Sequence, residues 1–272
     1  MDLFNSTLRF LTGGFVSLFG SLHPLVSLTV ISVLTGIAML WVFRHTSNQQ
    51  AILRTKKRLQ AHLLELRLFG DDLGEVWRAQ KNLLIANLRY TGLMLVPAVY
   101  MIVPLVILLI HLDAVYGRAP LPVGVPSVVT VQWQGASTPN GAAPQLQAPP
   151  EISVETPAVR ATAADQFSWR IRPTQAVSGT LRFAWNGESW EKTIAAGEQL
   201  EYLSVRRVSS FWDALWDPGE DRLAIAEATW VEVRYPGREI GLAGLELHWL
   251  IWFFVISMAS AYALKGYFKV TL

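Results

Sequence analysis

The sequence predicts an α-helical membrane protein with three transmembrane helices and a cytoplasmic coiled-coil hairpin, which carries an inserted all-β domain of the immunoglobulin-like sandwich type. Three observations lead to this fold class. Three apolar stretches lack Asp, Glu, Lys and Arg and have roughly the 20 residues that a membrane crossing needs. Basic residues concentrate between the first two stretches. Short runs of alternating apolar and polar residues fill the segment between the last two.

The composition excludes several classes of protein. The 272-residue chain holds no cysteine, which excludes a disulfide framework, thiolate zinc sites, iron–sulfur ligation and a cysteine nucleophile. Only 16% of its residues are charged, whereas a soluble domain usually has about 25%. The net charge of +2 does not indicate a nucleic-acid partner. Metalloprotease, hydrolase and P-loop motifs are missing, so we expect no enzyme, no small-molecule substrate and no cofactor.

Residues 1–22 predict an amphipathic helix that lies on the outer leaflet of a membrane. Asp2 stands where a signal peptide would carry positive charge, so a cleaved signal is not expected. The apolar residues of this segment recur near helical spacing: Leu3, Phe4, Leu8, Leu11, Phe15, Leu18, Phe19 and Leu22.

The three apolar stretches predict transmembrane helices at residues 23–43, 90–111 and 247–265. The alternative is that they are buried helices of a large soluble protein. We disfavour it because each stretch is flanked by charged or aromatic residues, and three such helices are hard to bury in one soluble core.

The distribution of basic residues predicts the orientation of these helices. Residues 44–89 hold nine Lys and Arg against four Asp and Glu, whereas residues 112–246 hold eleven basic and sixteen acidic residues. The hairpin and the tail at 266–272 are therefore expected in the cytoplasm, with the N-terminus and the β domain outside. We expect a multi-pass protein of a bacterial inner membrane.

Residues 44–89 predict an antiparallel coiled-coil hairpin of two helices that turn at Gly70. The apolar stripe of the first helix consists of Ile52, Leu59, Leu63 and Leu66, and that of the second of Leu73, Val76, Trp77, Leu84 and Leu88. The bases of the first arm are Arg54, Lys56, Lys57 and Arg58. They either fix the orientation alone or contact a ribosome, a nascent chain or anionic lipid headgroups.

The segment 112–246 predicts a sandwich of seven or eight short strands. Residues 135–150 are expected to form a flexible loop, and Asn186-Gly187 is a typical two-residue hairpin turn. The strands are expected at 126–134, 151–156, 166–172, 180–185, 188–194, 200–206, 228–235 and 238–243.

Four tryptophans are candidate interface anchors. Trp249 and Trp252 lie at the start of the third predicted span, and Trp212 and Trp216 lie in a short amphipathic segment of the β domain that could dock on the outer leaflet. For Trp212 and Trp216 the alternatives are packing in the core of the β domain or docking on a partner.

Three histidines, His23, His111 and His248, are expected at the outer ends of the three spans. With Asp113 and Glu246 they are a candidate zinc or copper site. Our main expectation is that no metal is bound, because interfacial histidines are common.

The arrangement resembles the YidC/Oxa superfamily of membrane protein insertases, in particular the small archaeal YidC-like members and the third subunit of the endoplasmic reticulum membrane complex. The match lies in KNLLIANLRYTGLMLVPAVYMIVPLVILLIHL (Lys81–Leu112) and in the closing WLIWFFVISMASAYALKGYFKV (Trp249–Val270). Two features depart from the family. The bacterial insertases carry an Arg within the first span, which is missing from Pro24–Phe43, and the β domain is an addition.

The resemblance implies a polar groove within the membrane, open to the cytoplasm, that lowers the cost of moving polar segments into lipid. Pro97 and Pro104 are expected to break the second span and free its carbonyl groups. The alternative for the hydroxyl side chains is that small polar residues let helices pack closely. The candidate groove residues are Ser27, Thr29, Ser32, Thr35, Arg44, Arg89, Thr91, Tyr100, Ser257 and Ser260.

The resemblance implies a factor that inserts or assembles membrane proteins without covalent catalysis. Its partners would be the lipid bilayer, nascent or client membrane proteins, and a ribosome or other envelope subunits. The alternative is a structural subunit of an envelope complex, whose β domain and coiled coil bind dedicated partners. The missing Arg and the large outer domain favour this alternative.

Overall fold

The structure is a computed structural model that describes Thr7, Gly13, Gly14 and residues 23–68, 73–134, 143–242, 244–268 and 270. It divides into two compact units. The helical unit comprises Leu28–Ile107 and Leu250–Leu272, and the β unit comprises Met1–Ser27 and Leu108–Trp249. Nearly all of the predicted amphipathic helix at 1–22, and the predicted turn at Gly70, lie outside the described residues.

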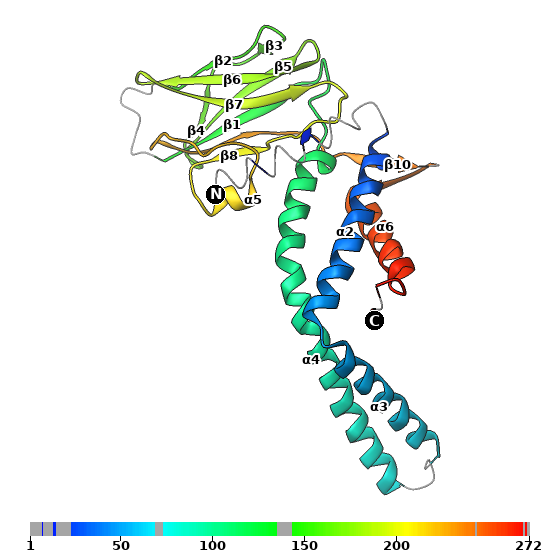
Figure 1. The fold of residues 1–272 in the computed structure, drawn as a ribbon. Coiled ribbons are helices and arrows are strands. Elements are labelled where there is room, and N and C mark those ends of the chain that lie inside the picture. The colour runs from blue at the N-terminus through cyan, green and yellow to red at the C-terminus, as the bar shows by residue number, and fades with distance from the viewer. Residues whose placement is uncertain are drawn as a thin grey trace. The chain divides into compact units, whose positions relative to one another are not determined.

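The helical unit contains α3 (Gln49–Leu68) and most of three further helices, whose ends extend beyond its limits (Figure 1). These are α2 (Pro24–Thr46), α4 (Leu73–Leu112) and α6 (Trp249–Leu264). Two of them, α2 and α4, are long and apolar enough to cross a membrane. The apolar helix α6 has 16 residues and rises about 24 Å, less than a ~30 Å hydrocarbon core. The third predicted span thus stays a prediction.

The second predicted span is part of one continuous helix. Helix α4 has 40 residues and contains both Pro97 and Pro104 in its interior. The prediction that these prolines break the helix is therefore wrong. Each proline removes one N–H donor, so the carbonyls of Leu93 and Tyr100, four residues earlier, lose their helical partners, while the apolar residues on both sides continue the helix. A π-helical turn at Asp113–Gly117 follows its end.

The helices of this unit meet in a small apolar core. Its buried residues are Leu40 and Phe43 of α2, Ile52 of α3, and Val270. Partly buried side chains of α4 and of the C-terminal region pack against them: Tyr90, Leu93, Met94, Met101, Ala261, Leu264 and Phe268. The core joins α3 to the apolar helices at the point where the predicted second span begins.

The predicted apolar seam of the hairpin matches the structure only in part: Ile52 is buried, and Leu59, Leu66 and Val76 are half-buried. On α4, Trp77, Leu84 and Leu88 are exposed, as is Leu63 on α3. The pattern marks an apolar face correctly, but these four side chains lie on the exterior of the hairpin. Small residues of α4, Ala79 and Ala86, are buried instead.

The β unit contains two main antiparallel sheets (Figure 1). The larger has the order β3-β5-β1-β9-β8, with β4 paired to β5, and the smaller has the order β2-β6-β7. A separate hairpin pairs β10 with β11. The bounds are β1 Ser127–Trp133, β2 Gln145–Gln147, β3 Ile152–Val154, β4 Val159–Ala161, β5 Gln166–Pro173, β6 Val177–Trp185, β7 Glu188–Ala196, β8 Arg206–Val208, β9 Ala228–Val233, β10 Glu239–Leu242 and β11 Leu245–His248.

Alternate side chains of both main sheets form one buried core, as the sequence pattern predicts. Its aromatic centre consists of Trp133, Phe167, Trp169, Phe183 and Trp190. The rings of Phe183 and Trp190 stack with centroids 5.5 Å apart. This shared core holds the two main sheets of the β unit together.

Most long strands match the predictions, as do the short strands β3 and β10, whereas the other short strands do not. The turn at Asn186-Gly187 has positive φ at both residues, 47° and 86°, as a two-residue hairpin requires. The strand predicted at 200–206 is wrong, because residues 201–205 are irregular and β8 begins at Arg206. Strand β2 lies within the predicted flexible loop, and strands β4 and β11 were not predicted. Because residues up to His248 pair with β10 as strand β11, helix α6 begins at Trp249 and not at residue 247 as predicted.

Candidate functional site

The hydroxyl groups of α2 donate to carbonyl oxygens of their own helix. Ser32 Oγ lies 2.7 Å from the Leu28 carbonyl oxygen, and Thr35 Oγ1 lies 2.8 Å from that of Ile31. Both side chains are buried. Because each hydroxyl is already paired within the helix, it can be buried among apolar neighbours at little cost.

The hydroxyl groups of α6 are paired in the same way and lie against α2. Ser260 Oγ donates to the Ser257 carbonyl oxygen at 2.8 Å. A Cβ atom on Gly36 would overlap Ser260 Oγ and would lie 2.6 Å from the Ser257 carbonyl oxygen. The two helices thus approach closely at small residues, which is the packing role that the sequence left open as the alternative.

The remaining candidate groove residues are not brought to this contact. Ser27 is buried in the β unit, where its Oγ accepts a hydrogen bond from Tyr116 Oη at 2.8 Å. Thr29 is half-buried, and Thr91 and Tyr100 are exposed on α4. Ser27, Thr91 and Tyr100 therefore lie in different environments and do not line one groove.

Two of the predicted basic residues line one cavity of the helical unit. Arg58 of α3 and Arg89 of α4 both border a space of about 430 Å³. Its other lining residues are Thr55, His62, Asn82, Ile85 and Ala86. Arg58 and Arg89 are themselves exposed, as are Arg44, Arg54 and Lys57, and Lys56 is half-buried. Arg58 and Arg89 are 31 positions apart, so only the pairing of the helices reveals this site.

An exposed apolar stripe follows one face of α4, and we call it the α4 stripe. Its six members recur at spacings of 7, 4, 7, 4 and 3 residues, which keeps them within about 40° of one line on a helix. Each is more than half exposed: Trp77, Leu84, Leu88, Leu95, Val99 and Ile102. Half of the stripe precedes the apolar run of α4 and half lies within it. Lys81 and Thr91 lie at the edges of the same face and are also exposed. Apolar exposure of this length marks a surface that lipid or protein covers.

The predicted tryptophan anchors occupy different environments. Trp249 is 1% exposed, and its Nε1 donates to Asp113 Oδ1 at 3.2 Å, so its prediction as an interface anchor is wrong. Trp252 is half-buried. Trp212 and Trp216, around the short helix α5 (Asp213–Trp216), are 71% and 62% exposed, which excludes packing in the core of the β unit.

The candidate metal site does not form. Within the described residues, no group of three or more His, Asp and Glu is positioned to hold a metal ion. His23 Nδ1 instead accepts a hydrogen bond from the Leu25 backbone N–H at the start of α2, at 3.2 Å. The ring of His111 lies 6.4 Å from that of Tyr202, and the ring of His248 lies beside Trp249.

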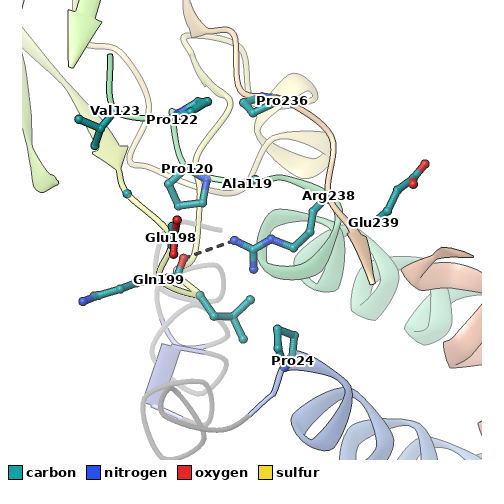
Figure 2. Close-up of a pocket in the computed structure, with 12 residues that line it drawn as sticks. Pro24, Ala119, Pro120, Pro122, Val123, Glu198, Gln199, Pro236, Arg238 and Glu239 are labelled. Atoms are coloured by element: carbon teal, nitrogen blue, oxygen red, sulfur yellow. Dashed lines mark hydrogen bonds between the residues drawn. The ribbon is translucent and has the colours of Figure 1, made fainter. Parts of the chain in front are cut away.

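One cavity of the β unit has a volume of about 790 Å³. Figure 2 shows four prolines on its walls: Pro24, Pro120, Pro122 and Pro236. Arg238 Nη2 donates to the Gln199 carbonyl oxygen at 3.3 Å, and burial lowers the pKa of the Arg238 guanidinium. This contact fixes the wall of the cavity at the base of the β unit.

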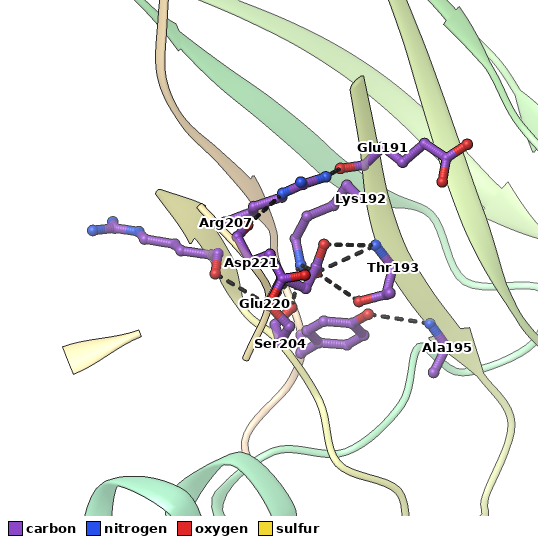
Figure 3. Close-up of polar contacts among 10 residues, drawn as sticks. Glu191, Lys192, Thr193, Ala195, Ser204, Arg207, Glu220 and Asp221 are labelled. Carbon is purple, nitrogen blue, oxygen red and sulfur yellow. Dashed lines mark hydrogen bonds and ion pairs between the residues drawn. The ribbon is translucent and has the colours of Figure 1, made fainter. Parts of the chain in front are cut away.

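A buried ion pair was not predicted from the sequence. Lys192 of β7 is fully buried, and its Nζ donates to Glu220 Oε1 at 2.5 Å and to the Ser204 carbonyl oxygen at 2.6 Å (Figure 3). Burial acts to raise the pKa of Glu220, but the Lys192 charge and the hydrogen bonds from Lys192, Thr193 and Ser204 lower it below its ordinary value. The alternation of β7 does place residue 192 between the inward Trp190 and Ile194, which is the signal that could have found it.

The cluster has the elements of a serine–lysine pair, but its geometry is structural. Lys192 Nζ lies 3.0 Å from Ser204 Oγ and donates to it. Glu220 holds the same ammonium group, so Lys192 is not available to accept a proton from the hydroxyl. Ser204 is also only 5% exposed. The cluster therefore ties β7 to the loops that carry Ser204 and Glu220.

Comparison of the chain with models of protein families, with curated proteins and with solved structures finds no match in any of the three.

Proposed function

We propose that this chain is a membrane-embedded factor that assists the insertion or assembly of other membrane proteins, of the YidC/Oxa type. In this proposal α2, α4 and α6 cross a bacterial inner membrane, with the α3–α4 hairpin in the cytoplasm and the β unit outside. The two long apolar helices and the exposed apolar side chains of α4 support membrane embedding. The apolar segment of α4 is only 6% buried, which is unlike a core helix of a soluble protein.

The observation that carries the proposal is the α4 stripe. From Trp77 to Ile102 it extends about 38 Å along one helix face. Lipid would cover its half near Ile102, whereas the half near Trp77 would face water. An apolar segment of a client protein fits this surface, because its transfer from the hairpin half to the lipid half keeps apolar contacts throughout.

The physical role of the chain would be to lower the cost of moving a client segment from water to lipid. Each exposed side chain of the stripe removes water from a client side chain before that side chain enters the bilayer. No covalent step is needed. The hydroxyls of α2 and α6 do not supply a polar groove in this scheme, since they bond within their own helices.

Insertion into proteoliposomes tests the proposal. The full chain is reconstituted with a short-tailed client protein, and the protease-protected fraction of the client is measured. Leu84→Gln with Leu88→Gln should lower insertion, because both changes interrupt the α4 stripe. Leu64→Gln with Leu68→Gln is the matched control, since these leucines are equally exposed but lie on α3. Equal insertion with and without the chain would contradict the proposal.

A structural subunit of an envelope complex is the second candidate. The close contact of Gly36 with Ser260 and the internally bonded hydroxyls favour it, because they suit a packed bundle better than a wet groove. Gentle solubilisation followed by mass spectrometry separates the two candidates. Many transient clients support an insertion factor, and one stoichiometric partner supports the structural role.

A further inference from the structure

The cavity between α3 and α4 is lined by polar and basic side chains where a helical hairpin normally buries apolar ones. Thr55, Arg58 and His62 come from one face of α3, at spacings of three and four residues. Asn82 and Arg89, seven residues apart, come from one face of α4. Two helices thus direct a set of hydrogen-bond donors at a single space.

The charge of this cavity favours an anion. Arg58 and Arg89 contribute two permanent positive charges and two planar sets of N–H donors. His62 Nδ1 lies 2.8 Å from Glu65 Oε2, so the carboxylate on this side is already engaged by the imidazole. Arginine forks match the oxygen atoms of a phosphate group, and the amide of Asn82 adds an uncharged donor. The Thr55 hydroxyl lines the cavity but donates to the Ala51 carbonyl oxygen at 2.8 Å, so it is not counted among the donors.

The position of the cavity along α4 indicates that a lipid headgroup is the source of the phosphate. Arg89 immediately precedes the apolar run that begins at Tyr90, and Asn82 lies about 10 Å further along the helix axis. If α4 crosses the membrane, this interval coincides with the headgroup layer, which is roughly 5–8 Å thick on each side. Ile85 and Ala86 supply an apolar wall within the same interval.

We propose that the cavity lined by Arg58, Arg89, His62, Asn82 and Thr55 binds a phosphate group, with the headgroup of an anionic phospholipid as its source. The headgroup would neutralise the paired arginines and would link α3 to α4 at the membrane surface. The choice of a lipid headgroup rests on the proposed membrane function, whereas the choice of a phosphate rests on the cavity alone.

Lipid retention by the full chain tests the inference. Phosphatidylglycerol bound to the chain in detergent micelles is measured by native mass spectrometry, without any client protein. Arg58→Gln with Arg89→Gln should weaken retention by at least about tenfold, because two charge-assisted contacts are lost. Lys57→Gln with Lys81→Gln removes the same charge from the same helices outside the cavity and should retain the lipid.

A second variant and two competitors complete the test. Arg58→Lys with Arg89→Lys keeps the charge but removes the planar forks, so it should fold normally and retain less lipid than the native chain. Inorganic phosphate in large excess should leave the lipid bound if the headgroup is the source, and should displace it if free phosphate is the source. Equal loss of lipid from both glutamine pairs would overturn the inference, as would displacement by single-stranded RNA alone. Failure of client insertion does not affect this readout.

Discussion

Gly36 of α2 and Ser260 of α6 are in direct contact, and the space between them does not admit a Cβ atom. A Cβ atom on Gly36 would also lie 2.6 Å from the Ser257 carbonyl oxygen, which belongs to the helix backbone and cannot rotate away. A glycine is therefore required here by the close approach of two helices.

We expect Gly36→Ala to destabilise the helical unit by about 1–3 kcal/mol, because the added methyl group forces α2 and α6 apart. Thermal unfolding in detergent, followed by circular dichroism, measures the effect. Gly92→Ala on α4 is the control. A Cβ atom there meets nothing within 4 Å, so alanine should be neutral or stabilise by up to about 1 kcal/mol. Equal melting of both variants would contradict the contact.

We expect Lys192→Ala to destabilise the β unit by about 3–5 kcal/mol, because Glu220 is left buried without its partner. Arg182→Ala is the control, since the Arg182–Glu191 pair is exposed and should contribute no more than about 1 kcal/mol. Denaturant unfolding followed by tryptophan fluorescence measures both. Similar midpoints for the two variants would show that the buried pair is not structural.

The stability of the β unit should depend on pH through Glu220. The pKa of this carboxyl is lowered in the folded protein from an ordinary value of 4.5. Its contribution is fully present above about pH 4.5, and it is lost as pH falls from there through the folded-state pKa, because the unfolded chain then binds more protons.

We therefore expect the stability difference between the native chain and Glu220→Gln to shrink as pH falls below about 4.5. Denaturant midpoints at several pH values measure it. Glu191→Gln removes an exposed carboxylate and should show a small difference at every pH. A difference that stays constant for Glu220→Gln would refute the assignment.

The long strands could be predicted because both main sheets bury one face against a common core. In β5 the alternation of Phe167, Trp169 and Ile171 is long enough to show a period of two. Strands β2 and β4 have three residues each, which is too short for any period to be read. Their existence depends on edge pairing with β6 and β5.

The candidate site could be predicted only in part, because a sequence shows faces but not what covers them. Leu84 and Leu88 mark an apolar face of α4, yet they are exposed. Trp249 and Trp212 are the same residue type and both were candidate interface anchors, but only Trp249 is buried. Arg58 and Arg89 line the same cavity only because α3 and α4 lie side by side.

We expect Trp249→Ala to cost about 3–5 kcal/mol, because a fully buried ring and its hydrogen bond to Asp113 are removed. Trp212→Ala should change the free energy of unfolding by no more than about 0.5 kcal/mol, since the ring is exposed. Thermal melts of the full chain in the same detergent compare the two. Equal costs would contradict the placement of Trp249 as a structural residue.

Photo-crosslinking from the α4 stripe tests the central proposal most directly. A photoreactive amino acid replaces Leu84 or Leu88 in membranes that contain ribosome-stalled client chains, and Leu64 serves as the matched exposed position on α3. We expect crosslinks to the apolar segment of the client from positions 84 and 88 and few from position 64. Crosslinks from positions 84 and 88 to one stoichiometric partner, with none to clients, would contradict it.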